Sequence, residues 1–155
     1  MPGYGIRGPG EGSGLLPWSW AVELLSSAKH YWVCTVDADR RPYASAVWAV
    51  WHADRLWFSC SGRSRKARNL ADNRLCVVTT EDAERPVVVD GVAERIDDRD
   101  AIEVMRVAMQ DKYAYPMDLS FLLANATFSV RPTKVIGLSQ DDFTGSPTRW
   151  RPPID

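Results

Sequence analysis

The residues with the clearest chemical potential lie together in one short segment, residues 59–70 (SCSGRSRKARNL). The segment combines hydroxyl residues (Ser59, Ser61, Ser64) with four cations (Arg63, Arg65, Lys66, Arg68). A guanidinium can grip two phosphate oxygens at once, and an ammonium adds a compact positive charge. Four cations within six residues repel one another unless an anion or solvent screens them. The composition of the segment therefore indicates a phosphate site.

The position of this segment points the same way. A strand over residues 56–60 ends there, Gly62 permits a tight turn, and a helix begins after Ser64, which is a good N-cap residue. A helix N-terminus presents unpaired N–H groups to an anion, and Ser64 can also donate its hydroxyl. The alternative is a solvated basic first turn, but cations there oppose the helix dipole. A nucleic-acid phosphate is a second alternative, which the net charge of −1 and the lack of a second basic stripe disfavour.

The elements around this segment are predicted to be short strands in hairpin order. Strands are expected at residues 31–37, 43–51, 56–60, 75–80, 86–96, 127–131 and 134–139, with a bulge at Gly91 and Pro132 separating the last two. Helices are expected at residues 17–29 and 99–112, the second capped by Asp97 or Asp98, with a helical turn at 119–123. Six or seven antiparallel strands with flanking helices predict a mainly β barrel.

Composition bounds the remaining possibilities. Residues 1–16 hold six glycines and two prolines and are expected to be a flexible tail, followed by one domain over residues 17–155. Three cysteines (Cys34, Cys60, Cys76) without CxxC spacing indicate free thiols, with no metal site. No signal peptide and no run long enough to cross a bilayer are visible, so a cytoplasmic protein without a membrane partner is expected.

The run FSCSGRSRKARNLADNRLCVV, followed by RPVVVDGVAERI, resembles the pyridoxamine 5′-phosphate oxidase-like, FMN-binding split-barrel family. Three family elements are present in order. They are Ser64-Arg65-Lys66 at a helix start, Asn73-Arg74-Leu75 entering a strand, and Gly91-Val92-Ala93-Glu94-Arg95 in the next strand. The resemblance implies a split β-barrel that forms a homodimer, with two flavins at the subunit interface.

The resemblance also implies site residues. Arg65 and Lys66 would bind the cofactor phosphate, and Ser59, Cys60 and Ser61 would line the phosphate and the ribityl chain. Ala46, Val47 and Trp48 would run along the isoalloxazine ring, although Trp48 could equally belong to the core. The cofactor would be FMN or the deazaflavin coenzyme F-420, acting in hydride transfer to or from a small molecule.

The sequence departs from true pyridoxamine phosphate oxidases at the substrate positions. Gapless alignment back from Phe58 places Ala44 and Ala49 where the family has basic residues, and Arg149-Trp150-Arg151 lacks the histidine of the family's C-terminal motif. Vitamin B6 oxidation is therefore not expected. No catalytic residue is evident; Tyr113 and Tyr115 could approach a substrate pocket or merely pack. A non-catalytic flavin- or haem-binding module of the same fold and a nucleic-acid-binding barrel stay open as alternatives.

Overall fold

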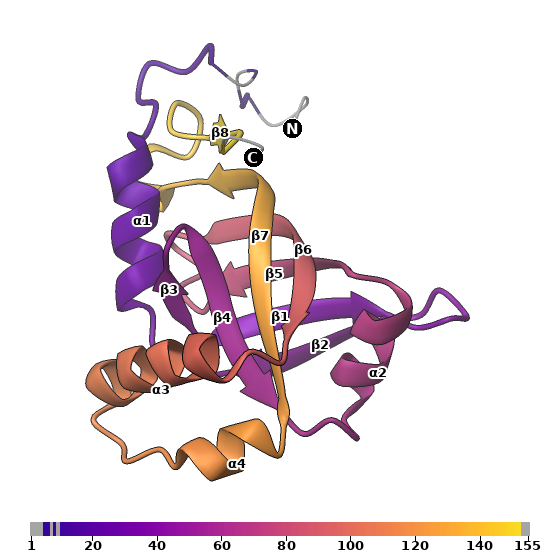
Figure 1. The fold of residues 1–155 in the computed structure, drawn as a ribbon. Helices are drawn as coiled ribbons and strands as arrows, with labels where there is room; N and C mark the ends of the chain where they lie inside the picture. The colour runs from indigo at the N-terminus through magenta and orange to yellow at the C-terminus, as the bar shows by residue number, and fades with distance from the viewer. Residues whose placement is uncertain (1–4, 7, 9, 153–155) are drawn as a thin grey trace.

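The computed structural model describes residues 5, 6, 8 and 10–152 and consists of one curled antiparallel sheet with flanking helices (Figure 1). The strands follow the order β2-β1-β5-β6-β7-β4-β3, with β8 paired to β7. The sheet curls until β2 contacts β4, which confirms the split barrel. The strands are β1 (Tyr31–Val36), β2 (Pro42–Val47), β3 (Val50–His52), β4 (Arg55–Cys60), β5 (Leu75–Thr80), β6 (Val87–Ile96), β7 (Ala126–Gly137) and β8 (Thr148–Trp150).

Helices flank the curled sheet (Figure 1). The helices are α1 (Trp18–Ser27), α2 (Arg65–Asp72), α3 (Arg99–Tyr113), α4 (Leu119–Leu123) and the short 3₁₀ helix η1 (Gln140–Asp142). The predicted caps form: the Ser64 hydroxyl accepts a hydrogen bond from the backbone N–H of Ala67 at 3.3 Å, and Asp98 accepts from Ala101 at 2.8 Å. Helix α2 packs on β1, where Asn69 donates to the Thr35 hydroxyl at 3.0 Å.

Two apolar clusters hold these layers together. The larger one fills the barrel and includes Phe58 and Phe128, whose ring centroids are 5.4 Å apart. The smaller one lies between the barrel wall and helices α3 and α4; its buried members are Val50, Ile102, Met105, Met109 and Leu122. Helices α3 and α4 therefore cover the outside of the barrel, over β3 and β7.

The predicted strand over residues 43–51 is wrong in one respect, because it breaks at Trp48 and Ala49. Tyr113, at the end of α3, donates a hydrogen bond from its hydroxyl to the Ala49 carbonyl and accepts one from the Ala49 N–H, both at 2.9 Å. These contacts occupy the backbone groups that a continuous strand would use. As a result β2 and β3 lie at opposite ends of the sheet order.

The region around Pro132 forms one strand, β7, instead of the two predicted. The register between β6 and β7 shifts at Gly91, so the predicted bulge is confirmed and Pro132 pairs opposite it. A Cβ on Gly91 would lie 2.5 Å from a Val130 methyl carbon, so only glycine fits there. The bulge accommodates a residue that has no N–H to give to the ladder.

The two ends of the chain meet beside β8, a strand that the sequence did not predict. The backbone N–H of Gly14 donates to Gly145 at 3.2 Å, and that of Leu16 donates to the Thr148 hydroxyl at 2.9 Å. The predicted flexible tail, residues 1–16, falls partly outside the described residues, and its mobility stays a prediction. Within the described part of the chain, no helix combines the length and apolar character needed to cross a membrane.

Candidate functional site

The turn between β4 and α2 is held by its own hydroxyl and backbone groups. The Ser61 hydroxyl accepts from the backbone N–H of Arg63 at 3.2 Å, and the Ser61 carbonyl accepts from Ser64 at 2.9 Å. The first helical residues, Arg65 and Lys66, have backbone N–H groups that no carbonyl of α2 can accept. The space that a side chain at Gly62 would occupy is open. The junction therefore presents free donors to solvent.

The positive charge of this junction is not neutralised within the described residues. None of Arg63, Arg65, Lys66 and Arg68 forms an ion pair with a described residue. Arg68 donates to the Arg63 carbonyl at 2.9 Å, and the Arg65 guanidinium lies 4.4 Å from the centre of the Tyr43 ring on β2. The structure thus joins the start of α2 to β2, a connection through Tyr43 that the sequence analysis missed.

A pocket of about 590 Å³ opens beside this junction, between the end of β4 and the α3–α4 connection. Four predicted site residues line it: Trp48, Ser59, Cys60 and Ser61. Its other lining residues are Met109, Tyr115, Pro116, Met117, Asp118, Phe121, Leu122 and Asn125. The Ser64 hydroxyl lies 3.5 Å from the Cys60 sulfur, so the pocket and the basic junction adjoin. The structure therefore brings seven of the nine predicted residues to one place.

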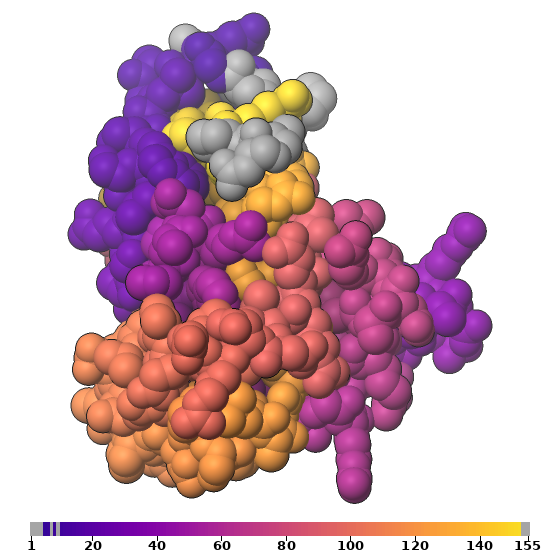
Figure 2. Space-filling view, viewed as in Figure 1, coloured from indigo at the N-terminus to yellow at the C-terminus, as the bar shows by residue number. Residues whose placement is uncertain are grey.

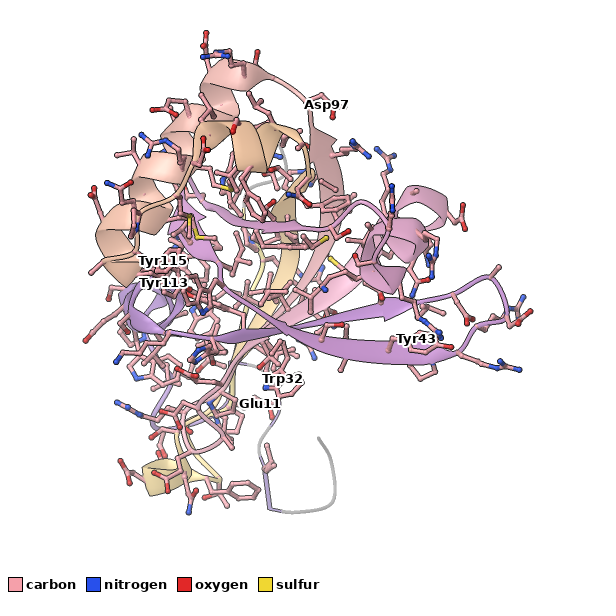
Figure 3. The ribbon with its side chains drawn as sticks, turned by 90° about the horizontal axis from the view of Figure 1, so that it is seen from below. Glu11, Trp32, Tyr43, Asp97, Tyr113 and Tyr115 are labelled. Atoms are coloured by element: carbon pink, nitrogen blue, oxygen red, sulfur yellow. The ribbon has the colours of Figure 1, made fainter. Side chains whose placement is uncertain are left out.

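The three predicted site residues at the end of β2 and just after it, Ala46, Val47 and Trp48, differ in their surroundings. Ala46 is exposed on the outer face of the sheet opposite Trp32, and Val47 is buried, so Val47 can offer a ligand only its backbone. Trp48 stacks on Tyr113 with ring centroids 4.5 Å apart and meets Tyr115 edge-on at 5.7 Å. Figure 3 shows Tyr113 and Tyr115 beside one another at the end of α3. Of the two tyrosines left unassigned, Tyr115 lines the pocket and Tyr113 supports Trp48.

A polar cluster that could not be predicted from the sequence contacts Ala49, the residue after Trp48. The Lys112 ammonium donates to the Tyr31 hydroxyl at 2.6 Å and to the Ala49 carbonyl at 3.0 Å, and Tyr31 donates to the Leu25 carbonyl at 2.5 Å. Burial lowers the pKa of Lys112 to about 8, against the opposing effect of Glu81, and burial raises the pKa of Tyr31. No local pattern could reveal this cluster, since its members come from α1, β1, α3 and the β2–β3 break.

Comparison with known proteins identifies the fold. The family model of pyridoxamine 5′-phosphate oxidase matches residues 20–136. Among curated proteins no match was found. Solved structures with similar folds include a conserved hypothetical protein from Mycobacterium tuberculosis, with 16% identity, a TM-score of 0.76, and coverage of 87% of this chain and 91% of that one.

Two other similar structures are of proteins with a named role. An F420 reductase has 24% identity and a TM-score of 0.61, and the match covers 73% of this chain and 93% of that one. The haem storage protein HutZ from Vibrio cholerae has 25% identity and a TM-score of 0.62, with coverage of 71% and 85%. The same fold therefore occurs in proteins described with different cofactors.

Proposed function

Because this chain belongs to the pyridoxamine 5′-phosphate oxidase family, we propose that it is an oxidoreductase that binds FMN or the deazaflavin coenzyme F-420 at the α2 junction. The observation that carries the proposal is a group of four cations, Arg63, Arg65, Lys66 and Arg68, that no described carboxylate neutralises and that lies beside an open turn and a pocket. An anion bound there relieves the mutual repulsion of the cations and satisfies the free backbone donors.

The donor set fits the phosphate of the cofactor. The N–H groups of Arg65 and Lys66 point from the start of α2, where the helix dipole favours negative charge. The Arg65 guanidinium and the Lys66 ammonium add charge-assisted hydrogen bonds. Ser64 keeps its capping role toward Ala67 while its hydroxyl proton, now directed at the Cys60 sulfur, can turn to a phosphate oxygen.

The neighbouring surface fits a flat ring. Strand β2 pairs only with β1 among the described strands, so its other edge offers unpaired backbone N–H and C=O groups to the polar edge of an isoalloxazine. The small side chains of Ala44 and Ala46 permit a close approach to this strand. Trp48 gives an aromatic surface at the pocket, and the apolar wall from α3 and α4 limits the access of water.

The chemistry would come from the cofactor. A bound flavin supplies hydride transfer at ring N5, or at C5 in a deazaflavin. The residues of this chain bind the phosphate, orient the ring against Trp48 and shape the space left for the second reactant. Both positions at which the family has basic residues hold alanine here, Ala44 and Ala49, so neither offers a cation to a substrate phosphate, and we do not propose vitamin B6 oxidation.

We further propose that a second copy of the chain completes the site. Large apolar side chains are exposed beside the pocket and on the outer face of the sheet, among them Trp32 (46%), Tyr115 (56%) and Phe121 (66%). Figure 3 shows Trp32 on the side of strands β1 and β2 that faces away from α3 and α4. Exposed aromatic groups of this kind are typical of subunit interfaces. A homodimer would enclose a flavin between two such surfaces.

A non-catalytic haem-binding module is the alternative, since a haem storage protein shares the fold. The positions of His30 and His52 favour flavin over haem, because neither histidine lines the pocket beside α2. A nucleic-acid-binding barrel is disfavoured, because the chain has a net charge of −1 and its basic segment, residues 63–68, is short. We therefore retain hydride transfer with a flavin or deazaflavin as the proposed activity in a non-membrane, cytoplasmic setting.

Separate titrations of the purified protein with FMN, coenzyme F-420 and haemin test this proposal. We expect one flavin to bind with a dissociation constant at least tenfold below that of haemin. Reoxidation of the bound reduced cofactor by a quinone or dye then distinguishes an enzyme from a carrier. If neither flavin binds, or if haemin binds more tightly than both, the proposed cofactor is wrong.

A further inference from the structure

A second and larger pocket, of about 720 Å³, lies at the other end of the barrel. Residues of α1, the β3–β4 turn, β7 and β8 line it, and none of them lines the pocket beside α2. Figure 1 shows β8 and α1 at the end of the molecule away from α2, and Figure 2 shows the C-terminal segment on the far side from α3 and α4. The cofactor proposed above does not account for this pocket.

Arginine side chains dominate the charge of the second pocket. Its lining includes Arg55, Arg131, Arg149 and Arg151, against one carboxylate residue, Asp54, among the described lining residues. Arg55 is neutralised by an ion pair with Glu94 at 2.7 Å. Arg131, Arg149 and Arg151 form no ion pair with a described residue. Among the described residues, three guanidinium groups of the pocket therefore have no carboxylate partner and can bind anionic oxygens, in a chain whose net charge is −1.

The apolar part of the second pocket is a cluster of three tryptophans. Trp18 packs edge-on against Trp51 at 6.2 Å and against Trp150 at 5.7 Å, measured between ring centroids. Trp150 reaches the same place from β8, which pairs with β7. Trp18 thus contacts both other indoles, and all three pack against the barrel core, so they form an aromatic wall that is in place without a bound ligand. Such a wall suits a planar ring, which can stack on it or pack against it edge-on.

The turn at the mouth of this pocket adopts an uncommon backbone conformation. Ala53 and Asp54 have φ angles of 49° and 55°, and both residues line the pocket. Asn-Gly is the sequence that most readily adopts two consecutive left-handed conformations, whereas the Cβ of an alanine makes this conformation sterically unfavourable. The hairpin between β3 and β4 keeps this conformation and so carries Arg55 and Trp51 on either side of the turn.

From the free arginines and the tryptophan wall together we propose that the second pocket binds a nucleoside di- or triphosphate. The phosphates would pair with Arg131, Arg149 and Arg151, and the base would lie on the Trp18–Trp51–Trp150 wall. A volume of about 720 Å³ falls within the range of small-molecule sites, about 300–1,000 Å³. A simple inorganic anion would leave the aromatic wall without a role.

ADP binding to the full chain, followed by tryptophan fluorescence and calorimetry, tests the proposal. We expect ADP to bind, adenosine to bind at least about tenfold more weakly because the charge-assisted bonds are missing, and pyrophosphate to bind more weakly than ADP because it lacks a ring. The double variant Arg131→Ala/Arg149→Ala should lower ADP affinity by about tenfold or more. Single variants Arg149→Gln and Arg151→Gln, both at exposed positions, provide a second measurement if the double variant does not fold.

The matched control separates this proposal from the flavin proposal. FMN is also an aromatic phosphate, so each ligand is titrated against Arg65→Ala/Lys66→Ala as well. We expect this control to keep ADP binding while it loses FMN, and the arginine variants of the second pocket to do the reverse. Loss of ADP binding in the α2 control, equal affinities for pyrophosphate and ADP, or no ADP binding in the millimolar range would each overturn the nucleotide site. None of these results would affect the assignment of FMN to α2.

Discussion

Lys66 at the start of α2 and Lys112 at the end of α3 both lie close to the pocket beside α2, but their ammonium groups differ in the partners that the folded chain gives them. Lys66 has no ion pair with a described residue and stands at a helix end with free backbone donors. Lys112 is committed to the Tyr31 hydroxyl and the Ala49 carbonyl at fixed distances, and burial lowers its pKa to about 8. The first lysine is available to a ligand, whereas the second is already used by the fold.

The difference between the two lysines separates a residue that can contribute affinity for a phosphate from one that fixes the position of its neighbours. A cation at the surface keeps its hydration and can exchange water for a phosphate oxygen. The half-buried Lys112 ammonium cannot move without leaving the polar groups around it unpaired, so it fixes the break between β2 and β3 instead. Through Ala49 and Tyr113 that break also sets the position of Trp48. Lys112 is therefore a positioning residue of the proposed site.

The largest expected effect falls on cofactor binding at Lys66. Lys66→Ala should weaken FMN or F-420 binding by about 1–3 kcal/mol through loss of a charge-assisted phosphate contact, with little change in stability. Dissociation constants from fluorescence titration measure the effect, and Lys29→Ala, another lysine outside the site, serves as the control. Unchanged affinity in Lys66→Ala would remove this lysine from the cofactor site.

The corresponding change at Lys112 should act on stability first. Lys112→Ala removes two hydrogen bonds from the cluster and a packed aliphatic stem, offset by the relief of a buried charge, so we expect a loss of about 1–2 kcal/mol in the free energy of unfolding. Urea denaturation measures it. The fluorescence of Trp48 should also shift, because its support on Tyr113 loosens. A variant as stable as the parent, with unchanged fluorescence, would contradict the positioning role.

The contrast between the two lysines also shows what can be predicted from sequence. The α2 junction could be predicted because its residues are consecutive: Gly62, the Ser64 cap and the cations follow one another along the chain. The bulge at Gly91 and the antiparallel barrel likewise follow from local turn chemistry and strand patterns. Each of these features depends on residues that are close together in the sequence, so a local pattern is enough to predict it.

Features made by distant residues could not be predicted. Lys112 meets Tyr31 across 81 positions, and no periodicity encodes that contact. The same holds for Tyr113, which breaks the strand predicted over residues 43–51, and for Tyr43 beneath the Arg65 guanidinium. Strand β8 and the second pocket depend on where the chain ends meet, which pattern alone does not specify. The predicted site residues remain a prediction until a cofactor is bound.

Two helix caps offer a smaller and sharper comparison. Ser64 and Asp98 cap α2 and α3 by the same type of hydrogen bond, at 3.3 Å and 2.8 Å. Ser64→Ala and Asp98→Ala should each cost about 1 kcal/mol of stability. Only Ser64→Ala should also weaken cofactor binding, since only its hydroxyl adjoins the pocket. Equal flavin affinities in the two variants would restrict Ser64 to a structural role.

The smallest expected effect is the pH dependence that Lys112 gives to stability. Its pKa is about 8 in the folded chain and 10.5 in the reference state, so between these values the unfolded chain holds more protons. Stability from this group therefore rises with pH across that window, with a slope well below the limit of about 1.4 kcal/mol per pH unit because solvent screens the exposed part of the side chain. Below pH 8 its contribution is constant.

Four other groups have raised pKa values, and the stability they contribute falls as the pH rises above about 9. These groups are Cys34, Cys76, Tyr31 and Tyr113. Measurements on the parent protein alone therefore cannot isolate the effect of Lys112.

The variant Lys112→Met separates these contributions, because it keeps the apolar stem and removes the titrating amine. The difference in unfolding free energy between the parent and Lys112→Met should grow in favour of the parent from pH 8 to pH 10, while both retain the cysteine and tyrosine terms. Urea denaturation at several pH values gives this difference directly. A difference that is flat across the window would mean that the Lys112 ammonium is fully hydrated in the folded protein. In that case Lys112 would resemble Lys66, and the contrast between a committed and an available cation would fail.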